Sequence, residues 1–534
     1  MGEIEQQAVV RSASGIPVPP CAGPDDVGAS VADRLGRPGE FPFTRGIHPE
    51  MYRVRPWTIR QLAGFGTAED TNERYRLLLD QGSTAINGVF DYPSLRAFGS
   101  DDPRATPDVG RGGVAVDVRD DFETLFRDIA VDQVSVSLVS SQPIGAVPHL
   151  AMYLSMAEQR GLARSSLSGT SQNDFLMETA ITIAPAALPP AGSFRLECDL
   201  IEFAVRELPR WNPVSITGYN YREAGADAPL ELGLCIAHGQ AIAVELLRRG
   251  LRAEDFLPRV SFFLCAHNDL FEEIGKFRAA RRMWSTWVRD ELGVADERSQ
   301  RFRFHTQTSG ATNVARYAHV NIARSSLQAL GAVLGGTQSL HVNGYDEALS
   351  IPTEHAALTA LRTQYVLLHE TGVAASADPL GGSWLVESMT DAVEAAALAI
   401  VEEIDAAGGV VAATESGWVH RELSQRAFAY QRSIDSGERL VVGVNTQCEG
   451  EDVEPEPFAL PLDAAGRQIQ RIEAVRRRRI EAATTKALER LGDAARDGAN
   501  VMSAAIDAVA ADATLGEIGE VFRTSLGTWE FPLW

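Results

Sequence analysis

The sequence predicts an α/β protein built on a (β/α)8 TIM barrel, with an extended N-terminal arm and a C-terminal helical region. Between residues 46 and 390, short β-branched runs alternate eight times with longer segments of helical periodicity. These runs also end in polar residues, as barrel strands do around an active site. The length of 534 residues suits two or three domains, or one large barrel with appendages, and the alternation favours the barrel.

The elements follow in order. Residues 1–45 are rich in Pro and Gly, which predicts an extended arm or a partly disordered tail. Helical segments such as 228–250 and 269–292 separate the predicted strands. The predicted strands are 83–91, 132–141, 165–172, 213–220, 258–267, 301–310, 337–344 and 373–379.

Three segments follow the predicted barrel. Residues 391–445 form a helical extension, residues 446–464 form an acidic, Pro-containing linker, and residues 465–534 are again helical. The run Arg476–Arg479 is flanked by acids, so we interpret it as a solvated helix face rather than a nucleic-acid patch.

The charge balance excludes two classes of partner. Lys plus Arg is 49 and Asp plus Glu is 72, a net charge of −23, which argues against nucleic acid and against anionic membranes. No run of 18 apolar residues occurs and the N-terminus lacks a signal-peptide pattern, so no membrane span is predicted. The five cysteines are widely spaced without a zinc pattern, which predicts a reduced cytoplasmic protein without a metal site.

The polar strand ends predict an active site at one mouth of the barrel. Alternatively, strands need polar residues wherever they exit into loops. The residues are Asp91, Ser140, Ser141, Gln172, Tyr219, Asn220, His267, His305, Gln307, His341, Asn343 and Asp378.

Small hydroxyl residues recur inside three predicted strands. Barrels are usually filled by Val, Ile and Leu, so these residues predict a channel for a long polar ligand. The alternative is cross-strand hydroxyl pairing in a smaller core. The residues are Ser135, Ser137, Ser168, Thr170, Ser215 and Thr217.

No GxGxxG, Walker, GxSxG or HExxH motif is present in the sequence. Longer stretches of sequence are more informative. From about residue 12 to 445, the chain resembles the catalytic chain of the methylmalonyl-CoA mutase family, which are adenosylcobalamin-dependent acyl-CoA mutases. The strings are RPWTIRQLAGFGTAEDTNERYRLLL (55–79), FDYPSLRAFGSDDPRATPDVGRGGVAVD (90–117), GTSQND (169–174), SITGYNYREAGA (215–226), KFRAARRMW (276–284), HTQTSG (305–310) and TQSLHVNGYDEAL (337–349).

The resemblance implies an isomerase that rearranges the carbon skeleton of an acyl-CoA by radical chemistry, with pantetheine inside the barrel. It implies catalytic roles for Gln172, Tyr219 and Asn220. It implies substrate contacts by Arg55, Thr58, Arg60, Thr170, Arg259, Ser261 and His305. It implies cofactor contacts by Phe90, Gly112, Glu223, Gln307, Gly310 and Glu370.

Departures from the family pattern concern the substrate. Methylmalonyl-specific members have Tyr and Arg where this chain has Leu62 and Thr182, so no group grips a free carboxylate. A branched, non-carboxylated short-chain acyl group is therefore expected, of the isobutyryl, 2-hydroxyisobutyryl or pivalyl type. The aspartate that binds the hydroxyl in hydroxyisobutyryl-type members is replaced by Val89, which argues against that substrate.

Asn220 replaces the family's histidine and cannot transfer a proton. A catalytically impaired, mutase-like acyl-CoA-binding subunit is therefore an alternative. An unrelated barrel lyase or aldolase is a third interpretation. Such an enzyme would need a Schiff-base lysine or a metal cluster at a strand end, and the sequence pattern indicates neither.

The resemblance also predicts partners. Single-chain members carry a cobalamin-binding domain with a DxHxxG motif, which is absent here. A separate small subunit with that motif is therefore expected to supply the lower ligand of adenosylcobalamin. This chain would be the large subunit, as a homodimer within a heterotetramer, with a G-protein chaperone for cofactor loading.

Overall fold

A computed structural model describes residues 10–27, 31–182, 185–450, 452, 455–459, 461 and 463–531. Residues 1–9 and 28–30 of the predicted arm lie outside the described residues. So do residues 451, 453, 454, 460 and 462 of the predicted linker, and residues 532–534 at the end of the predicted helical region.

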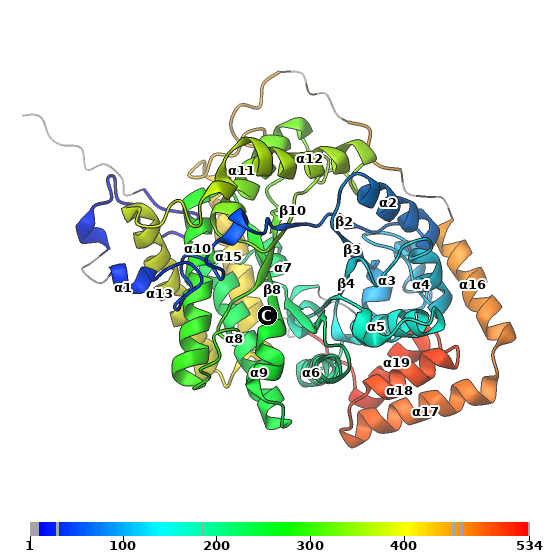
Figure 1. The fold of residues 1–534 in the computed structure, drawn as a ribbon. Coiled ribbons are helices and arrows are strands. Elements are labelled where there is room, and N and C mark those ends of the chain that lie inside the picture. Colours follow the sequence, from blue (N-terminus) through cyan, green and yellow to red (C-terminus); the bar gives the residue numbers. More distant parts are fainter. Residues whose placement is uncertain are drawn as a thin grey trace, which may run out of the picture.

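Two five-stranded parallel sheets form the centre of the molecule (Figure 1), in the orders β1-β10-β9-β8-β7 and β2-β3-β4-β5-β6. The strands are β1 Thr58–Ile59, β2 Leu62–Ala63, β3 Ala85–Val89, β4 Ser135–Ser141, β5 Gly169–Asn173, β6 Trp211–Asn212, β7 Val214–Ile216, β8 Val260–Ala266, β9 Phe304–Thr308 and β10 Ser339–His341.

The two sheets supply the eight strand positions of a TIM-type barrel, and this agrees with the predicted fold class. β1 and β2 are halves of one strand position, and β6 and β7 are halves of another. Hydrogen bonding around the ring is interrupted at these two positions. At the second position the reason is Pro213, which has no N–H to donate to a neighbouring strand.

Helices surround the strands. They are α1 Val31–Leu35, α2 Ala68–Asp80, α3 Tyr92–Leu95, α4 Arg119–Leu125, α5 Pro143–Gln159, α6 Pro190–Glu207, α7 Gly218–Glu223, α8 Ala228–Arg248, α9 Ala253–Phe256, α10 Leu270–Thr286, α11 Asn321–Leu334, α12 Glu354–Glu370, α13 Trp384–Ala406, α14 Val410–Glu415, α15 Trp418–Asp435, α16 Ala464–Arg478, α17 Glu481–Asp497, α18 Met502–Ala510 and α19 Leu515–Leu526. Two large hydrophobic clusters lie between strands and helices, one for each sheet.

Seven of the eight predicted strand runs contain a strand, but the prediction for 373–379 is wrong. That segment begins with a 3-10 turn, Val373–Ala375, and Val373 is its only β-branched residue. The missing strand position is 58–63, where the polar Arg60 and Gln61 interrupt the β-branched pattern.

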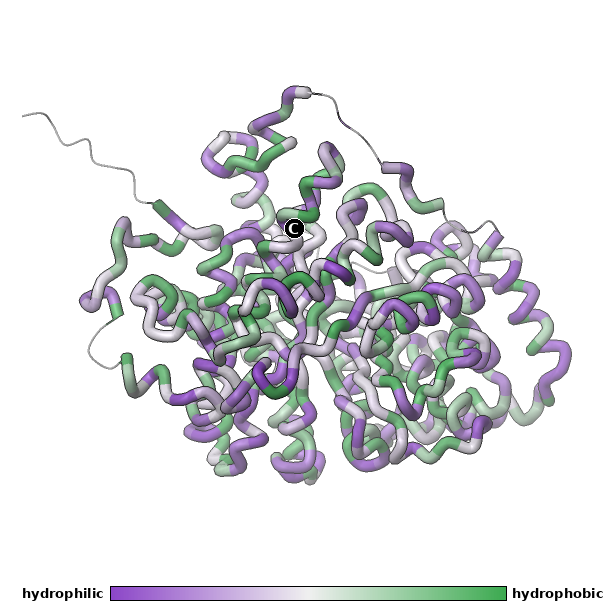
Figure 2. The backbone as a smooth tube through the Cα atoms, turned by 45° about the horizontal axis from the view of Figure 1, so that its top comes forward, coloured by the Kyte–Doolittle hydropathy of each residue, from purple (hydrophilic) through white to green (hydrophobic). Residues whose placement is uncertain are grey.

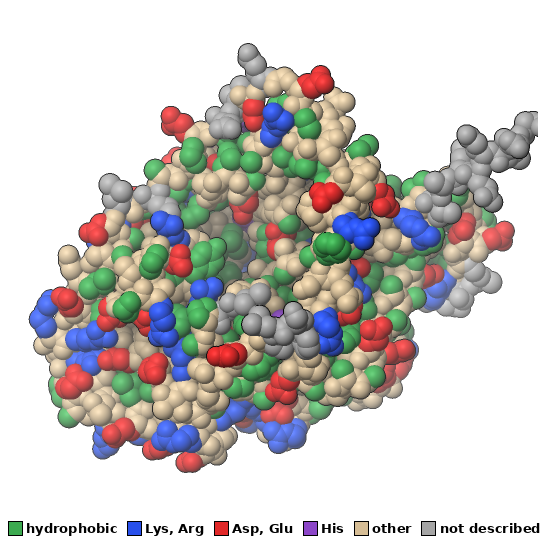
Figure 3. All heavy atoms as spheres, turned by 180° about the vertical axis from the view of Figure 1, so that it is seen from behind, with side chains coloured by type: hydrophobic (Ala, Val, Ile, Leu, Met, Phe, Trp, Pro, Cys, Tyr) green, Lys and Arg blue, Asp and Glu red, His purple; other side chains and the backbone are tan. Residues whose placement is uncertain are grey.

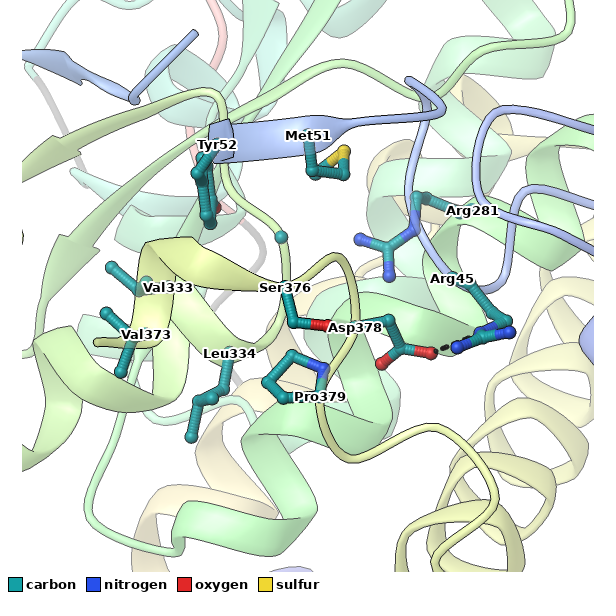
Figure 4. A pocket seen from close by; sticks show the side chains of 11 residues that line it. Arg45, Met51, Tyr52, Arg281, Val333, Leu334, Val373, Ser376, Asp378 and Pro379 are labelled. Carbon is teal, nitrogen blue, oxygen red and sulfur yellow. Dashed lines mark hydrogen bonds and ion pairs between the residues drawn. The ribbon is translucent and has the colours of Figure 1, made fainter. Parts of the chain in front are cut away.

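Residues 373–379 instead hold the N-terminal segment against the barrel (Figure 4). Asp378 accepts from Arg45 at 3.0 Å and from Arg278 at 2.5 Å. The buried Arg281 donates to the backbone carbonyls of Phe43, Thr44 and Gly335. Asp378 is therefore an anchor for the arm and does not belong to the polar mouth, contrary to the sequence prediction.

The C-terminal helices α16–α19 cover the outside of the α4–α5 half of the barrel (Figure 1). The outermost helix, α16, is mostly hydrophilic in Figure 2. Arg476, Arg477 and Arg478 are partly exposed and each pairs with a carboxylate, as a solvated face requires. Arg479 differs, because its side chain is only 6% exposed between Glu481 and Glu517.

One described helix, α8, is long and apolar enough to cross a membrane, but 72% of its apolar window is buried inside the fold. It packs against α10 and α13 as a barrel helix. All five cysteines are unpaired. Among the described residues, no three His, Cys, Asp or Glu side chains are grouped to hold a metal ion.

Candidate active site

The inner face of the barrel carries many polar side chains. Registered pairs place Asn87, Ser137, Thr170 and Asn212 side by side across four strands. Ser215 pairs with Ser261, while the neighbouring residues Ile216 and Phe262 point outward into the hydrophobic core. The predicted interior hydroxyls at Ser137, Thr170 and Ser215 therefore lie inside the barrel.

Both interpretations of these hydroxyls have support. The Ser261 Oγ donates to the Val214 carbonyl at 2.6 Å, and Asn212 donates to the Thr170 Oγ1 at 3.2 Å, so some hydroxyls do pair across strands. Thr217 is different, because its N–H and hydroxyl both donate to the buried Asp174 outside the lumen.

Basic side chains gather where the strands begin. The pKa of His48 is lowered by burial and by Arg301, Arg303 and Arg55, so these charges lie close together. Within the described ranges, Arg55, Arg301 and Arg303 make no ion pair, and Arg303 hydrogen-bonds only Asn212 and the Pro258 carbonyl. Unpaired guanidinium groups suit phosphate.

Arg259 is not free to join this group. Its guanidinium donates to five backbone carbonyls, with the Leu208 and Val205 oxygens closest at 2.8 Å, and it thereby holds the end of α6. It still lines a cavity of about 420 Å³ together with Arg298. The sequence predicts a substrate contact for Arg259 but none for Arg298, Arg301 or Arg303.

Inside the lumen, Arg60 donates to the Ser135 hydroxyl at 2.9 Å, and burial lowers the pKa of Arg60 to about 10. The His305 Nδ1 is 2.8 Å from the Ser339 hydroxyl, while its buried Nε2 has no partner. Burial, followed by the Arg60 charge, lowers the pKa of His305 well below its ordinary value. His305 is therefore a neutral ring with one nitrogen available. Thr58 of β1 pairs with Ser339 of β10, which is the residue that contacts His305.

The opposite end of the strands forms an acidic mouth, and Figure 3 shows a hollow near the middle of one face with acidic side chains around it. The Tyr219 ring stacks on Phe263 with centroids 5.0 Å apart. Glu223 accepts from the Ser309 hydroxyl at 2.7 Å and from the Ala311 N–H at 2.6 Å. Burial, followed by the Glu223 charge, raises the pKa of Tyr219, so its hydroxyl stays a neutral donor.

The mouth contains Asn343, one of the predicted polar strand ends, and Glu347, which the sequence alone did not single out. Gln307 donates to the Asn343 Oδ1 at 3.0 Å, and the buried Asn343 Nδ2 has no hydrogen-bond acceptor in the part of the chain that the structure describes. Burial, followed by Glu223 and Asp346, raises the pKa of Glu347 to about 8. Both residues lie within the string TQSLHVNGYDEAL, so the signal was present in the sequence.

Two predicted cofactor residues lie elsewhere. Glu370 is exposed at the last position of α12, which runs back from the mouth towards the strand starts, where Tyr365 bonds the Gly82 carbonyl. Phe90 is fully buried, with its ring stacked 4.0 Å from His149. Glu347 occupies the place expected for Glu370, because a helix after a parallel strand returns to the other end of the barrel.

The remaining predicted residues cluster near the mouth. Val89 and Gln172 both pair with Val139 at the ends of β3 and β5. Leu62 is beside Asn87, and Asn220 is next to Tyr219 on α7. Leu62, Val89, Thr182 and Asn220 are partly exposed.

Comparison with known proteins decides the family. A family profile described as Methylmalonyl-CoA mutase matches residues 11–528. The chain belongs to the methylmalonyl-CoA mutase family. It is 41% identical to the 2-hydroxyisobutanoyl-CoA mutase large subunit of Aquincola tertiaricarbonis, over 94% of this chain and 90% of that protein. It is 39% identical to the probable mitochondrial methylmalonyl-CoA mutase of Caenorhabditis elegans, over 95% of this chain and 68% of that protein.

As a member of the methylmalonyl-CoA mutase family, the chain is a B12-dependent acyl-CoA mutase and hence an isomerase. The mouth fits a large planar cofactor with polar edges. A Cβ at Gly310 would lie 3.0 Å from the Glu223 carboxylate and 3.2 Å from the Tyr219 hydroxyl. At Gly112, where φ is +70°, a Cβ would lie 2.8 Å from the Tyr92 ring. At these glycines no side chain projects from the surface, which leaves room for a flat ligand. Polar contacts are available from Glu223, Gln307, Asn343 and Glu347.

The raised pKa of Glu347 gives a test of its place in this mutase. Because its pKa is higher in the folded protein than in the unfolded chain, the stability that its proton contributes is lost as the pH rises to about 8. Glu347→Gln removes that loss. We expect it to raise the free energy of unfolding, relative to the unchanged protein, by about 2 kcal/mol more at pH 8 than at pH 6 in urea titrations. Glu370→Gln is the matched control, and the same pH-dependent gain in both variants would contradict the assignment.

Proposed function

We propose that this chain is the large subunit of a two-component adenosylcobalamin-dependent mutase acting on a branched, non-carboxylated short-chain acyl-CoA. The observation that carries the proposal is a largely polar inner face, which leads from the arginines at the strand starts to the mouth at the strand ends. A 2-hydroxyisobutanoyl-CoA mutase large subunit, 41% identical over nearly the whole of both chains, supports it.

Coenzyme A fits this path in one direction. Its phosphates would lie against Arg55, Arg301 and Arg303, whose guanidinium groups pair with no carboxylate of the described residues. Its pantetheine amides would meet the available His305 Nε2 and the Arg60 guanidinium inside the lumen. The thioester would then lie near Gln172 and Tyr219 at the mouth.

When bound, adenosylcobalamin supplies the radical chemistry that starts the 1,2-rearrangement. Glu223, Gln307, Asn343 and Glu347 would hold its polar edges. Tyr219 would donate a hydrogen bond beside the reacting carbons, since its buried phenol stays protonated. Phe263 fixes the ring, and the surrounding helices exclude water from the reacting group.

The acyl end favours a neutral group. Leu62 and Val89 are apolar, and Thr182 is uncharged. A carboxylate at this place would be desolvated without a cationic partner, at a cost of several kcal/mol. Isobutyryl, 2-hydroxyisobutyryl and pivalyl groups meet this condition.

We also propose the partners of the chain and its location in the cell. A separate small subunit carrying DxHxxG would supply the lower ligand of the cobalt, and two large subunits would pair within a cytoplasmic heterotetramer. A G-protein chaperone would load the cofactor.

Reconstitution tests the proposed function. The large subunit, the small subunit and adenosylcobalamin are mixed with isobutyryl-, 2-hydroxyisobutyryl-, 3-hydroxybutyryl-, pivalyl- or methylmalonyl-CoA, and products are separated by mass spectrometry. We expect isomerised product from a non-carboxylated thioester. No product from any of the five would contradict the proposal.

Asn220 favours one alternative, a catalytically impaired acyl-CoA-binding subunit, because an amide cannot transfer a proton. Asn220→His decides between the two. Turnover by the unchanged protein supports the mutase. Binding of acyl-CoA without turnover in either form supports the impaired subunit.

Arg60→Met tests the coenzyme A path. The variant removes a buried cation that has no carboxylate partner within the described part of the chain. Hydrogen bonds to charged groups contribute about 1.5–3 kcal/mol, so we expect acyl-CoA affinity to fall by roughly 10- to 100-fold in calorimetry. The melting temperature should not fall, because an unpaired buried charge is also lost. The exposed Arg53→Met is the control, and an unchanged affinity in Arg60→Met would count against this path.

A further inference from the structure

The carboxyl-terminal ends of β3, β4 and β5 border the place proposed for the acyl group. Val89, Val139 and Gln172 lie side by side, two residues beyond the inward-facing Asn87, Ser137 and Thr170. Because side chains alternate along a strand, these three also face the interior. The next residues of β4 therefore determine what borders the acyl group.

β4 is irregular at this point. The pairing with β5 shifts by one residue between Val139 and Ser141, as in a β-bulge. Ser141 has a φ of +51°, in the left-handed region that a serine rarely adopts. Bulges and strained residues are frequent beside active sites, where they redirect a side chain. Here they turn Gln142 out of the alternation of the strand.

The hydrogen bonds of Gln142 leave one acceptor unused. Its carbonyl accepts from Gly145 and Ala146 at the start of α5, and its Nε2 donates to the Thr182 Oγ1 at 2.9 Å. The Thr182 hydroxyl gives its only proton to the Met177 carbonyl at 2.8 Å. Thr182 can therefore only accept from Gln142, and this fixes which end of the amide faces it.

Among the described residues, the Gln142 Oε1 consequently has no donor, and it is buried on a side chain that is only 1% exposed. An unsatisfied buried carbonyl oxygen is costly, and in a native protein a bound group is one explanation for keeping it. Thr182, Val89 and Leu62 are partly exposed, so solvent reaches this end of the barrel. The group that fits is a neutral donor of one hydrogen bond.

We infer that Gln142, held by Thr182, selects an acyl group that carries a hydroxyl, which donates its hydrogen bond to the Gln142 Oε1. The inference rests on the proposed function and narrows its substrate to hydroxyacyl thioesters. A carboxylate offers no proton to this oxygen and would be repelled by it. A purely aliphatic group would leave the oxygen unsatisfied, so the site discriminates against both.

Two pairs of thioesters that differ by one hydroxyl test the inference, 2-hydroxyisobutyryl- against isobutyryl-CoA and 3-hydroxybutyryl- against butyryl-CoA. The reconstituted enzyme should prefer the hydroxylated member of at least one pair by about 100-fold or more in kcat/KM. Gln142→Met, which keeps length and loses the acceptor, should lower that ratio at least about 10-fold by slowing the hydroxylated substrate alone. Gln133→Met, at an exposed position, is the control.

Thr182→Val provides a second variant, because it removes the hydroxyl that orients the amide and should lower the same ratio. An unchanged ratio in both variants, or an equal loss for both members of each pair, would overturn the inference. If no thioester is rearranged by any form, the proposed function fails instead. The relative affinity of the large subunit for each pair, measured by calorimetry, then judges Gln142 separately.

Discussion

Replacing Lys276 by methionine is expected to lower the free energy of unfolding by about 3–5 kcal/mol, which is the cost of breaking a buried ion pair from one side. The Lys276 side chain is fully buried, and its Nζ lies 2.6 Å from carboxylate oxygens of both Glu231 and Glu273. Burial alone would lower the pKa of Lys276, but these two carboxylates raise it overall, so the ammonium stays charged. Methionine keeps the length but removes the cation that pairs with both buried acids, and Glu273 then retains only its ion pair with Arg222.

Replacing Lys276 should also disturb the active site. Lys276 also donates to the Cys265 carbonyl at 2.7 Å, while Glu231 accepts from the Cys265 N–H at 2.8 Å. This peptide lies beneath Tyr219 and Glu223, since Cys265 packs with Tyr219 and Phe263. Arg222, on the same helix as Tyr219, bonds Glu273 at 3.1 Å. The cluster therefore supports both sides of the mouth.

Lys486 provides a matched control, because it is exposed on α17. Lys486→Met should change stability by less than about 0.5 kcal/mol in urea titrations. Equal effects of the two variants would show that the buried cluster contributes nothing particular.

Tyr219→Phe is expected to lower kcat by about 10²- to 10³-fold, the usual result of removing one preorganised hydrogen-bond donor from an active site. The change deletes only the hydroxyl, and the stacking on Phe263 is preserved. Since the phenol is buried and protonated, its role is to donate at the mouth rather than to carry charge. KM should change little, because the coenzyme A contacts lie at the other end of the barrel.

Initial rates of the reconstituted enzyme measure this effect, with thermal unfolding as the check on folding. Tyr317→Phe is the control, since its hydroxyl bonds the Glu449 carbonyl away from the mouth. A tenfold rise in KM with an unchanged kcat would place Tyr219 in substrate binding instead.

Much of the barrel could be predicted from the sequence, because strand-and-helix alternation is a local property. Seven of the eight runs predicted from this alternation contain a strand. The strand position at 58–63 was missed for a physical reason, since its inward residue Arg60 is polar and its pairing is split between two neighbours. The run 373–379 failed because short Ala- and Ser-rich segments carry little information about long-range pairing.

The site was predicted unevenly, and the errors share a cause. Tyr219, Glu223 and Gln307 meet at the mouth as expected, because their strands end there. Glu370 and Glu347 are both acids that follow the strand at 339–341, and only the return path of α12 separates them. Arg259 and Arg303 both precede strands, and only the packing of α6 decides which guanidinium is occupied.

The sequence by itself determined the family, the barrel and the residue types available at its mouth, because these depend on local pattern and on matched strings. Tertiary structure alone decided which of those residues are free to act. The unused acceptor of Gln142, the unpaired Arg60 and the occupied Arg259 all follow from hydrogen bonds between segments far apart in the chain. A donor or a charge becomes available only when the fold has paired its neighbours, and no local pattern contains that information.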